Sequence, residues 1–129
     1  MADLLFENGF HGRYTVRGQE LLIGYDEIQP YDMTYGAIAS CLYSTFLEIA
    51  RENGVEIRRC AVHVSGTKRS TVPSTVSHLT IRFAPEAEAD PSFLEHTFQE
   101  ALEKCSMVAT FRHVAKIDAK LELSPKEAA

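Results

Sequence analysis

Three cysteines, Cys41, Cys60 and Cys105, are the residues in this sequence best suited to nucleophilic or redox chemistry. A thiolate attacks electrophiles, and two thiols can cycle through a disulfide. An odd number of cysteines at wide spacing does not form a structural disulfide framework. We therefore expect free thiols in a reducing, cytoplasmic setting, where a disulfide would be transient or catalytic.

Spacing alone favours a small core residue at each of these positions, because buried free cysteine is common. Cys41 lies more than two turns from the start of its predicted helix, where the helix macrodipole does little to acidify a thiol. The helix carries no cation before Arg51. A reactive Cys41 therefore needs a cation from another segment to lower its pKa.

The sequence lacks the motifs of other common catalytic and nucleotide-binding sites. The chain has no G-x-S-x-G, no P-loop and no G-x-G-x-x-G. Its histidines are scattered; His63 and His78 could be cross-strand neighbours, but two imidazoles make a weak case for zinc. We expect no metal and no cofactor. The loop with Lys68 and Arg69 is either an anion site or, more simply, a solvated loop.

The element that must position Cys41 is a long helix predicted over 31–54. Asp32 is expected to cap its first turn, and Asn53-Gly54 supplies a left-handed exit. One continuous apolar face consists of Ile38, Cys41, Leu42, Thr45, Phe46 and Ile49. The opposite face, with Ala37, Ser40, Ser44 and Leu47, is small or apolar. A helix apolar on both sides is buried on both sides.

Alternating apolar and polar residues predict strands in the rest of the chain. These strands are expected over 8–16, 20–25, 55–65, 76–83 and 114–123. Ile57 falls out of phase, which predicts a bulge near Arg58-Arg59. Asp90-Pro91 opens a second helix, which ends near Cys105 and continues as a short helix over 106–113. Residues 124–129 are read as a frayed tail.

The order β-β-α-β-β-α-β predicts an α+β fold, with an antiparallel-rich sheet packed on the long helix. The length of 129 residues indicates one domain, residues 1–129. One chain offers a single sheet to a helix that needs cover on two sides, so we expect a homodimer.

The charge balance and the absence of long apolar segments limit the partners. The net charge of −5 argues against nucleic acid, whose binding depends on phosphate neutralisation. No segment approaches the roughly 20 apolar residues of a membrane span. The N-terminus has no basic region before an apolar run, so we expect no secretory signal.

The sequence resembles the OsmC/Ohr family of thiol-dependent hydroperoxide reductases over most of its length. The resemblance rests on the N-terminal hairpin region, on Pro30 with the long helix containing Ala37-Ile38-Ala39-Ser40-Cys41-Leu42, and on the helix end Glu100-Ala101-Leu102-Glu103-Lys104-Cys105-Ser106. The family has a reactive cysteine in its first long helix and a second at the end of the later helix. Its members are intertwined homodimers with their sites at the subunit interface.

The resemblance implies roles for specific residues. Cys41 would be the peroxidatic nucleophile, and Cys105 would condense with its sulfenic acid to a disulfide. The family uses an Arg from the N-terminal strands to hold the thiolate; Arg13 is the nearest match and Arg17 the second choice. The family Glu that holds this Arg is not matched, because Tyr31 and Asp32 stand near its place. Ser106 follows the second cysteine, where the better-characterised family peroxidases have Pro.

The leading hypothesis is therefore a peroxidase that reduces organic hydroperoxides with electrons from a dithiol. Its apolar substrate pocket would be lined by Phe10, Tyr14, Ile38, Phe46 and Phe111. The alternative is a non-catalytic dimer of the same fold that binds a small ligand or senses redox state. The missing Glu favours this alternative.

Overall fold

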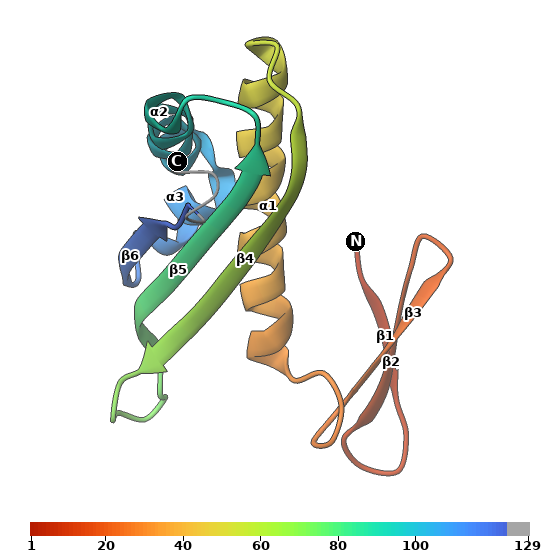
Figure 1. Cartoon of the computed structure of the whole chain (residues 1–129). Helices are drawn as coiled ribbons and strands as arrows, with labels where there is room; N and C mark the ends of the chain where they lie inside the picture. Colours follow the sequence, from red (N-terminus) through yellow and green to blue (C-terminus); the bar gives the residue numbers. More distant parts are fainter. Residues whose placement is uncertain (124–129) are drawn as a thin grey trace. The chain divides into compact units, whose positions relative to one another are not determined.

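The computed structural model of the protein describes residues 1–123 and divides into two compact units, Met1–Thr34 and a second unit that begins at Tyr35. The structure is α+β, as predicted, with the element order β1-β2-β3-α1-β4-β5-α2-α3-β6 (Figure 1). The predicted order lacked β1 and did not count the short helix α3 separately. The predicted tail at 124–129 lies outside the described residues.

The first unit is an antiparallel sheet in the order β1-β2-β3, formed by Asp3–Phe6, His11–Val16 and Gln19–Gly24. A two-residue turn joins β2 to β3, with φ of 50° at Arg17 and 75° at Gly18. Two left-handed residues in succession are typical of a tight hairpin. The turn falls between the strands predicted over 8–16 and 20–25. β1 escaped prediction because its three successive apolar residues show no alternation.

The long helix is confirmed as α1, which spans Pro30–Glu52. Pro30, predicted to precede the helix, occupies its first turn, where a missing N–H costs nothing. The predicted role of Asp32 is wrong in detail. Asp32 lies inside the first turn, and its carboxylate accepts the N–H of Gln29 at 2.9 Å. It therefore fixes the entry to the helix from within, as the acidic residue of a capping box does.

The predicted exit of α1 is confirmed. Gly54 has a φ of 74°, and its N–H donates to the Arg51 carbonyl at 3.0 Å. The Val55 N–H donates to the Ala50 carbonyl at 2.9 Å. These two bonds satisfy carbonyls that the last helical turn leaves free.

The second unit contains a sheet in the order β4-β5-β6. β4 (Ile57–Lys68) and β5 (Val76–Ala87) form a long antiparallel hairpin, and β6 (Lys116–Leu121) pairs in parallel with β5. The register shifts between Ile57 and Arg59, so the predicted bulge is confirmed. Both long strands continue past their predicted ends, since pairing in the hairpin extends them. The six strands thus form two sheets, where a single sheet was expected.

Two helices complete the second unit, α2 (Pro91–Lys104) and α3 (Ser106–Phe111). Asp90 caps α2 as predicted, because its carboxylate accepts the Ser92 N–H at 2.8 Å. Phe46 of α1, Phe83 of β5 and Phe98 of α2 are all fully buried. Their ring centroids lie 4.8 Å and 5.1 Å apart in that order. The core therefore forms where α1 and α2 pack on the β4-β5-β6 sheet (Figure 1).

Within one chain, α1 is buried along one face. This face consists of Ile38, Leu42, Phe46, Ile49 and Ala50. Ser40 and Ser44 on the opposite face are exposed, and Ala37 and Leu47 are half-buried. The second covering layer that the sequence predicts for this face does not come from the described residues of the same chain.

Candidate redox site

Cys41 lies in the middle of α1, half-buried beside the core stripe. It is adjacent in sequence to the fully buried Leu42, which anchors this part of the helix. The rigid helix therefore holds the thiol at the edge of the core, where a small reactant could approach it.

Cys105 lies at the break between α2 and α3. Its backbone is extended, with φ of −70° and ψ of 119°, so it ends one helix and caps the next. Its N–H donates to the Ala101 carbonyl at 2.8 Å, and its own carbonyl accepts the Ala109 N–H at 3.0 Å. The side chain is fully buried. Both helices thus fix the position of the second thiol.

The fold brings these two thiols together although 64 positions separate them in sequence. Their Sγ atoms are 3.4 Å apart, and the Cys105 thiol donates a hydrogen bond to the Cys41 sulfur. A disulfide bond is about 2 Å long. The sulfurs therefore need to approach by little more than about 1 Å to form one. This distance is short enough for a redox pair without rearrangement of the helices.

The surroundings of Cys41 favour its thiolate. Partial burial raises its pKa, but the backbone N–H of Met107, the Ser106 hydroxyl, the Cys105 thiol and the Ser106 N–H all donate toward the sulfur. The hydrogen bonds outweigh the burial, so the pKa of Cys41 is lowered. A lowered thiol pKa is the property of an attacking cysteine.

Cys105 has the opposite character. Burial raises its pKa, the backbone N–H of Val108 opposes that effect, and the hydrogen bond and negative charge of Cys41 raise it further. The net direction is upward, so Cys105 is the weaker acid of the two thiols. The two thiols in contact therefore differ in acidity, and the Cys105 thiol is the hydrogen-bond donor to the Cys41 sulfur.

Sequence reasoning did not include Ser106 among the site residues. Its Oγ lies 3.7 Å from the Cys41 sulfur. The sequence offered one signal, which is the position of Ser106 directly after Cys105. A residue next to Cys105 lies close to any residue that Cys105 contacts.

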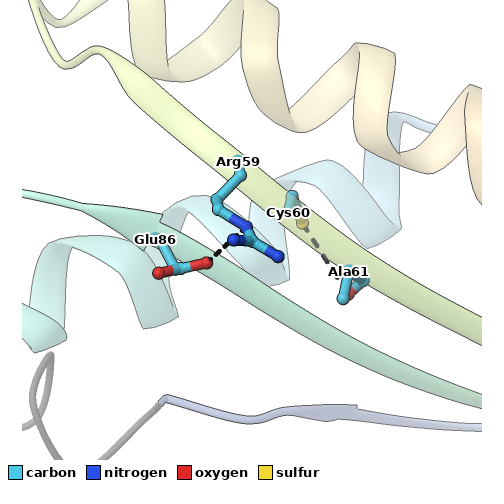
Figure 2. Close-up of polar contacts among 4 residues, drawn as sticks. All are labelled: Arg59, Cys60, Ala61 and Glu86. Atoms are coloured by element: carbon cyan, nitrogen blue, oxygen red, sulfur yellow. Dashed lines mark hydrogen bonds and ion pairs between the residues drawn. The ribbon is translucent and has the colours of Figure 1, made fainter.

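Cys60 stands apart from this pair on β4, next to the ion pair of Arg59 and Glu86 (Figure 2). Arg59 Nε lies 2.8 Å from Glu86 Oε2. Successive strand residues point to opposite faces, which separates the Cys60 thiol from this cation. Burial raises the pKa of Cys60 to about 12. The thiol is therefore protonated and inert at neutral pH. Cys60 is half-buried on its strand, where the sequence predicted a small core residue.

Arg13 lies on β2 in the first unit, opposite Leu5 and Leu22 in the register of the sheet. It is exposed and lines a pocket of about 370 Å³ together with His11, Glu7 and Glu27. Arg17 belongs to the hairpin turn. The role of either arginine at the thiolate stays a prediction.

The alternative sites do not gain support. β4 and β5 do pair, but His63 lies opposite Arg82 and His78 opposite Thr67, so the two histidines are not cross-strand neighbours. Among residues 1–123, no group of three or more metal-ligating side chains forms. The Arg69 guanidinium donates to Thr75 Oγ1 and to the carbonyls of Val76 and Val114. It therefore fixes its own loop to neighbouring backbone.

Comparison with known proteins decides the family. The sequence model described as "OsmC-like protein" matches residues 24–120, about three quarters of the chain. The chain belongs to the OsmC-like family. The matched range includes α1 and the break between α2 and α3, and thus both thiols of the pair.

Solved structures agree with this OsmC-like fold. An OsmC-like protein from Mycoplasma pneumoniae superimposes with a TM-score of 0.85 at 10% identity, covering 95% of each chain. The organic hydroperoxide resistance protein OhrB of Bacillus subtilis has a TM-score of 0.72 at 14% identity, covering 95% of this chain and 98% of its own. A protein from Legionella pneumophila, titled organic hydroperoxide resistance protein OsmC, has a TM-score of 0.75 at 12% identity, covering 95% of each chain.

No curated protein matches the OsmC-like chain in sequence. None of the helices described in residues 1–123 has the length and apolar character needed to cross a membrane.

Proposed function

We propose that this OsmC-like protein is a thiol-dependent peroxidase that reduces organic hydroperoxides through Cys41 and Cys105. The observation that carries the proposal is the 3.4 Å contact between two thiols whose pKa values move in opposite directions. The structural similarity to the organic hydroperoxide resistance proteins of Bacillus subtilis and Legionella pneumophila supports the choice of substrate.

In the first step, the Cys41 thiolate attacks the terminal oxygen of the hydroperoxide. A sulfur–oxygen bond forms as the oxygen–oxygen bond breaks, and the alkoxide leaves and takes a proton from water to become an alcohol. Cys41 is thereby oxidised to a sulfenic acid. The hydrogen bonds around Cys41 lower its pKa, which favours the thiolate for this attack.

In the second step, the Cys105 sulfur attacks the Cys41 sulfur. A disulfide forms, the sulfur–oxygen bond breaks, and the departing hydroxide takes the Cys105 proton to become water. An external dithiol then reopens the disulfide by two exchange reactions and is itself oxidised. Because Cys105 is protonated and already in contact, it does not compete for the peroxide but resolves the sulfenic acid at once.

Two of the five residues predicted to line an apolar substrate pocket are not available for that role. Ile38 and Phe46 are fully buried in the core, so neither lines an opening to solvent. Phe10, Tyr14 and Phe111 are half-buried and remain candidates for an apolar lining. We retain Arg13 as the candidate cation at the thiolate.

The proposal also covers the oligomeric state and the cellular compartment of the protein. The exposed outer face of α1 supports a homodimer acting as one OsmC-like domain per chain over residues 1–129. The three free cysteines support a reducing compartment, and we place the enzyme in the cytoplasm.

The test is peptide mapping by mass spectrometry after one equivalent of cumene hydroperoxide without reductant. Rapid formation of a Cys41–Cys105 disulfide, with Cys60 still reduced, is the expected result. Thiols that stay intact for many minutes would contradict the peroxidase. The alternative of a ligand-binding or redox-sensing dimer would then take its place.

A further inference from the structure

Ser106 begins α3 and is exposed at the same edge of the core as Cys41. Its hydroxyl oxygen lies 3.7 Å from the Cys41 sulfur, close enough for a hydrogen bond to sulfur. Because Cys105 ends α2 with an extended backbone, the next residue turns back toward α1. The hydroxyl therefore reaches the nucleophile from the residue that directly follows the second thiol.

The helix α3 does not require a hydrogen bond from the Ser106 hydroxyl. The N-cap residue of α3 is Cys105, and no side-chain hydrogen bond caps this helix, so the Ser106 hydroxyl is not held as a cap. Cys105 is fully buried and its thiol donates to the Cys41 sulfur, whereas Ser106 is exposed and its hydroxyl oxygen lies 3.7 Å from the same sulfur. Side chains of two consecutive residues thus contact the Cys41 sulfur.

We propose that Ser106 is a positioning residue for the reactive thiol: its hydroxyl donates to the Cys41 thiolate, holds it at the edge of the core and keeps it ionised. The inference rests on the proposed function in assigning Cys41 as the attacking thiol. It goes beyond that function in assigning thiolate stabilisation to an uncharged side chain of this chain.

The contact also affects the redox couple. A hydrogen bond to the thiolate stabilises the reduced form, and the disulfide offers no equivalent negative charge to accept it. Ser106 therefore favours the reduced state, which makes the Cys41–Cys105 pair a stronger oxidant. Loss of the hydroxyl is expected to shift the equilibrium with a glutathione buffer toward the disulfide.

Three substitutions test the role of the hydroxyl. Ser106→Ala removes the hydroxyl, and Ser106→Thr keeps one. Ser106→Pro removes both the hydroxyl and the backbone N–H. Proline is suited to the first helical position, and the extended backbone of Cys105 is compatible with a following proline, so this variant is expected to fold. The matched control is Ser40→Ala, because Ser40 is next to Cys41 but its hydroxyl donates to the Ala37 carbonyl.

The measurement is the rate of Cys41 alkylation by iodoacetamide as a function of pH, with the product located by peptide mass mapping. We expect the midpoint to move to higher pH in Ser106→Ala and at least as far in Ser106→Pro. At neutral pH the alkylation rate should fall roughly tenfold or more, as loss of one hydrogen bond to a charged group predicts. Ser106→Thr and Ser40→Ala should keep the midpoint of the original protein.

Rates at high pH, where every variant is ionised, should agree, which separates a pKa effect from a loss of structure. An unchanged midpoint in Ser106→Ala would overturn the inference. Alkylation requires no peroxide, so the two proposals can fail separately. If no disulfide forms with cumene hydroperoxide but the alkylation midpoint shifts in Ser106→Ala, the role of Ser106 is supported and the peroxidase is contradicted. If the disulfide forms and the midpoint does not shift, the peroxidase is supported and the role of Ser106 is contradicted.

Discussion

The two thiols of the site differ because of what surrounds each sulfur. Cys41 accepts hydrogen bonds from backbone and side-chain donors, whereas Cys105 is buried and has the negative charge of Cys41 beside it. The sequence led us to expect that a cation must acidify Cys41. The donors from Ser106, Met107 and Cys105 are uncharged groups, so part of the activation requires no cation.

Serine variants should separate the two roles. Cys41→Ser should abolish peroxide consumption, because burial raises the pKa of Cys105, the remaining thiol of the pair. Cys105→Ser should still react once and should then accumulate a sulfenic acid at Cys41, because nothing resolves it. Dimedone trapping followed by mass spectrometry distinguishes the two variants. Dimedone adducts at Cys105 in the Cys41→Ser protein would reverse the assigned roles.

Cys60 should make stability fall at alkaline pH. Its pKa is about 12 in the folded protein and about 8.5 in an unfolded chain. Between these values the unfolded chain loses the Cys60 proton and the folded chain keeps it, so the free energy of unfolding falls as pH rises. Urea unfolding at several pH values should show a shallower decline in Cys60→Ala than in the unchanged protein. Equal slopes would contradict the buried, protonated thiol.

At the scale of elements, replacing either of two glycines in the α1 region by alanine should have opposite effects on stability. Gly36 lies inside α1, and a Cβ there would have no neighbour within 4 Å. Gly36→Ala should therefore stabilise the protein by about 0.5–1 kcal/mol through helix propensity. Gly54 has a φ of 74°, so Gly54→Ala should destabilise it by about 1 kcal/mol or more.

Urea unfolding of both variants measures this difference, and each serves as the control for the other. Destabilisation by Gly36→Ala would show that another surface packs closely against this turn of α1, such as a second subunit. Tolerance of Gly54→Ala would contradict the left-handed end of the helix.

Elements with strong periodicity were predictable, and their pairing was not. The apolar stripe of α1, the Asp90 cap of α2 and the alternation along β5 each determine local structure, and all three were confirmed. β1 was not predicted, because its apolar residues do not alternate with polar ones. Cys41 and Cys105 were identified through family resemblance. The end of the second helix near Cys105 was predicted, but the contact of Ser106 with Cys41 joins residues 65 positions apart and depends on tertiary packing.

At the scale of the whole molecule, α1 has an outer face that one chain leaves exposed. We expect a homodimer at micromolar concentration in sedimentation velocity experiments. Ser44→Glu places a charge on this exposed face and should weaken the dimer. Thr80→Glu, on the exposed polar face of β5, is the matched control and should leave the dimer intact. A monomer at all concentrations, or equal effects of the two variants, would contradict an interface at α1.

The contact between Cys41 and Cys105 also joins distant parts of the chain. A bond between residues 64 positions apart closes a large loop and reduces the entropy of the unfolded chain. The chain-entropy relation gives about 4 kcal/mol for a loop of this size. The oxidised protein should therefore unfold at a clearly higher temperature than the reduced one, and Cys105→Ser should remove the difference. Each turnover would switch the protein between two levels of resistance to unfolding, so a thermal melt reports its redox state without any chromophore.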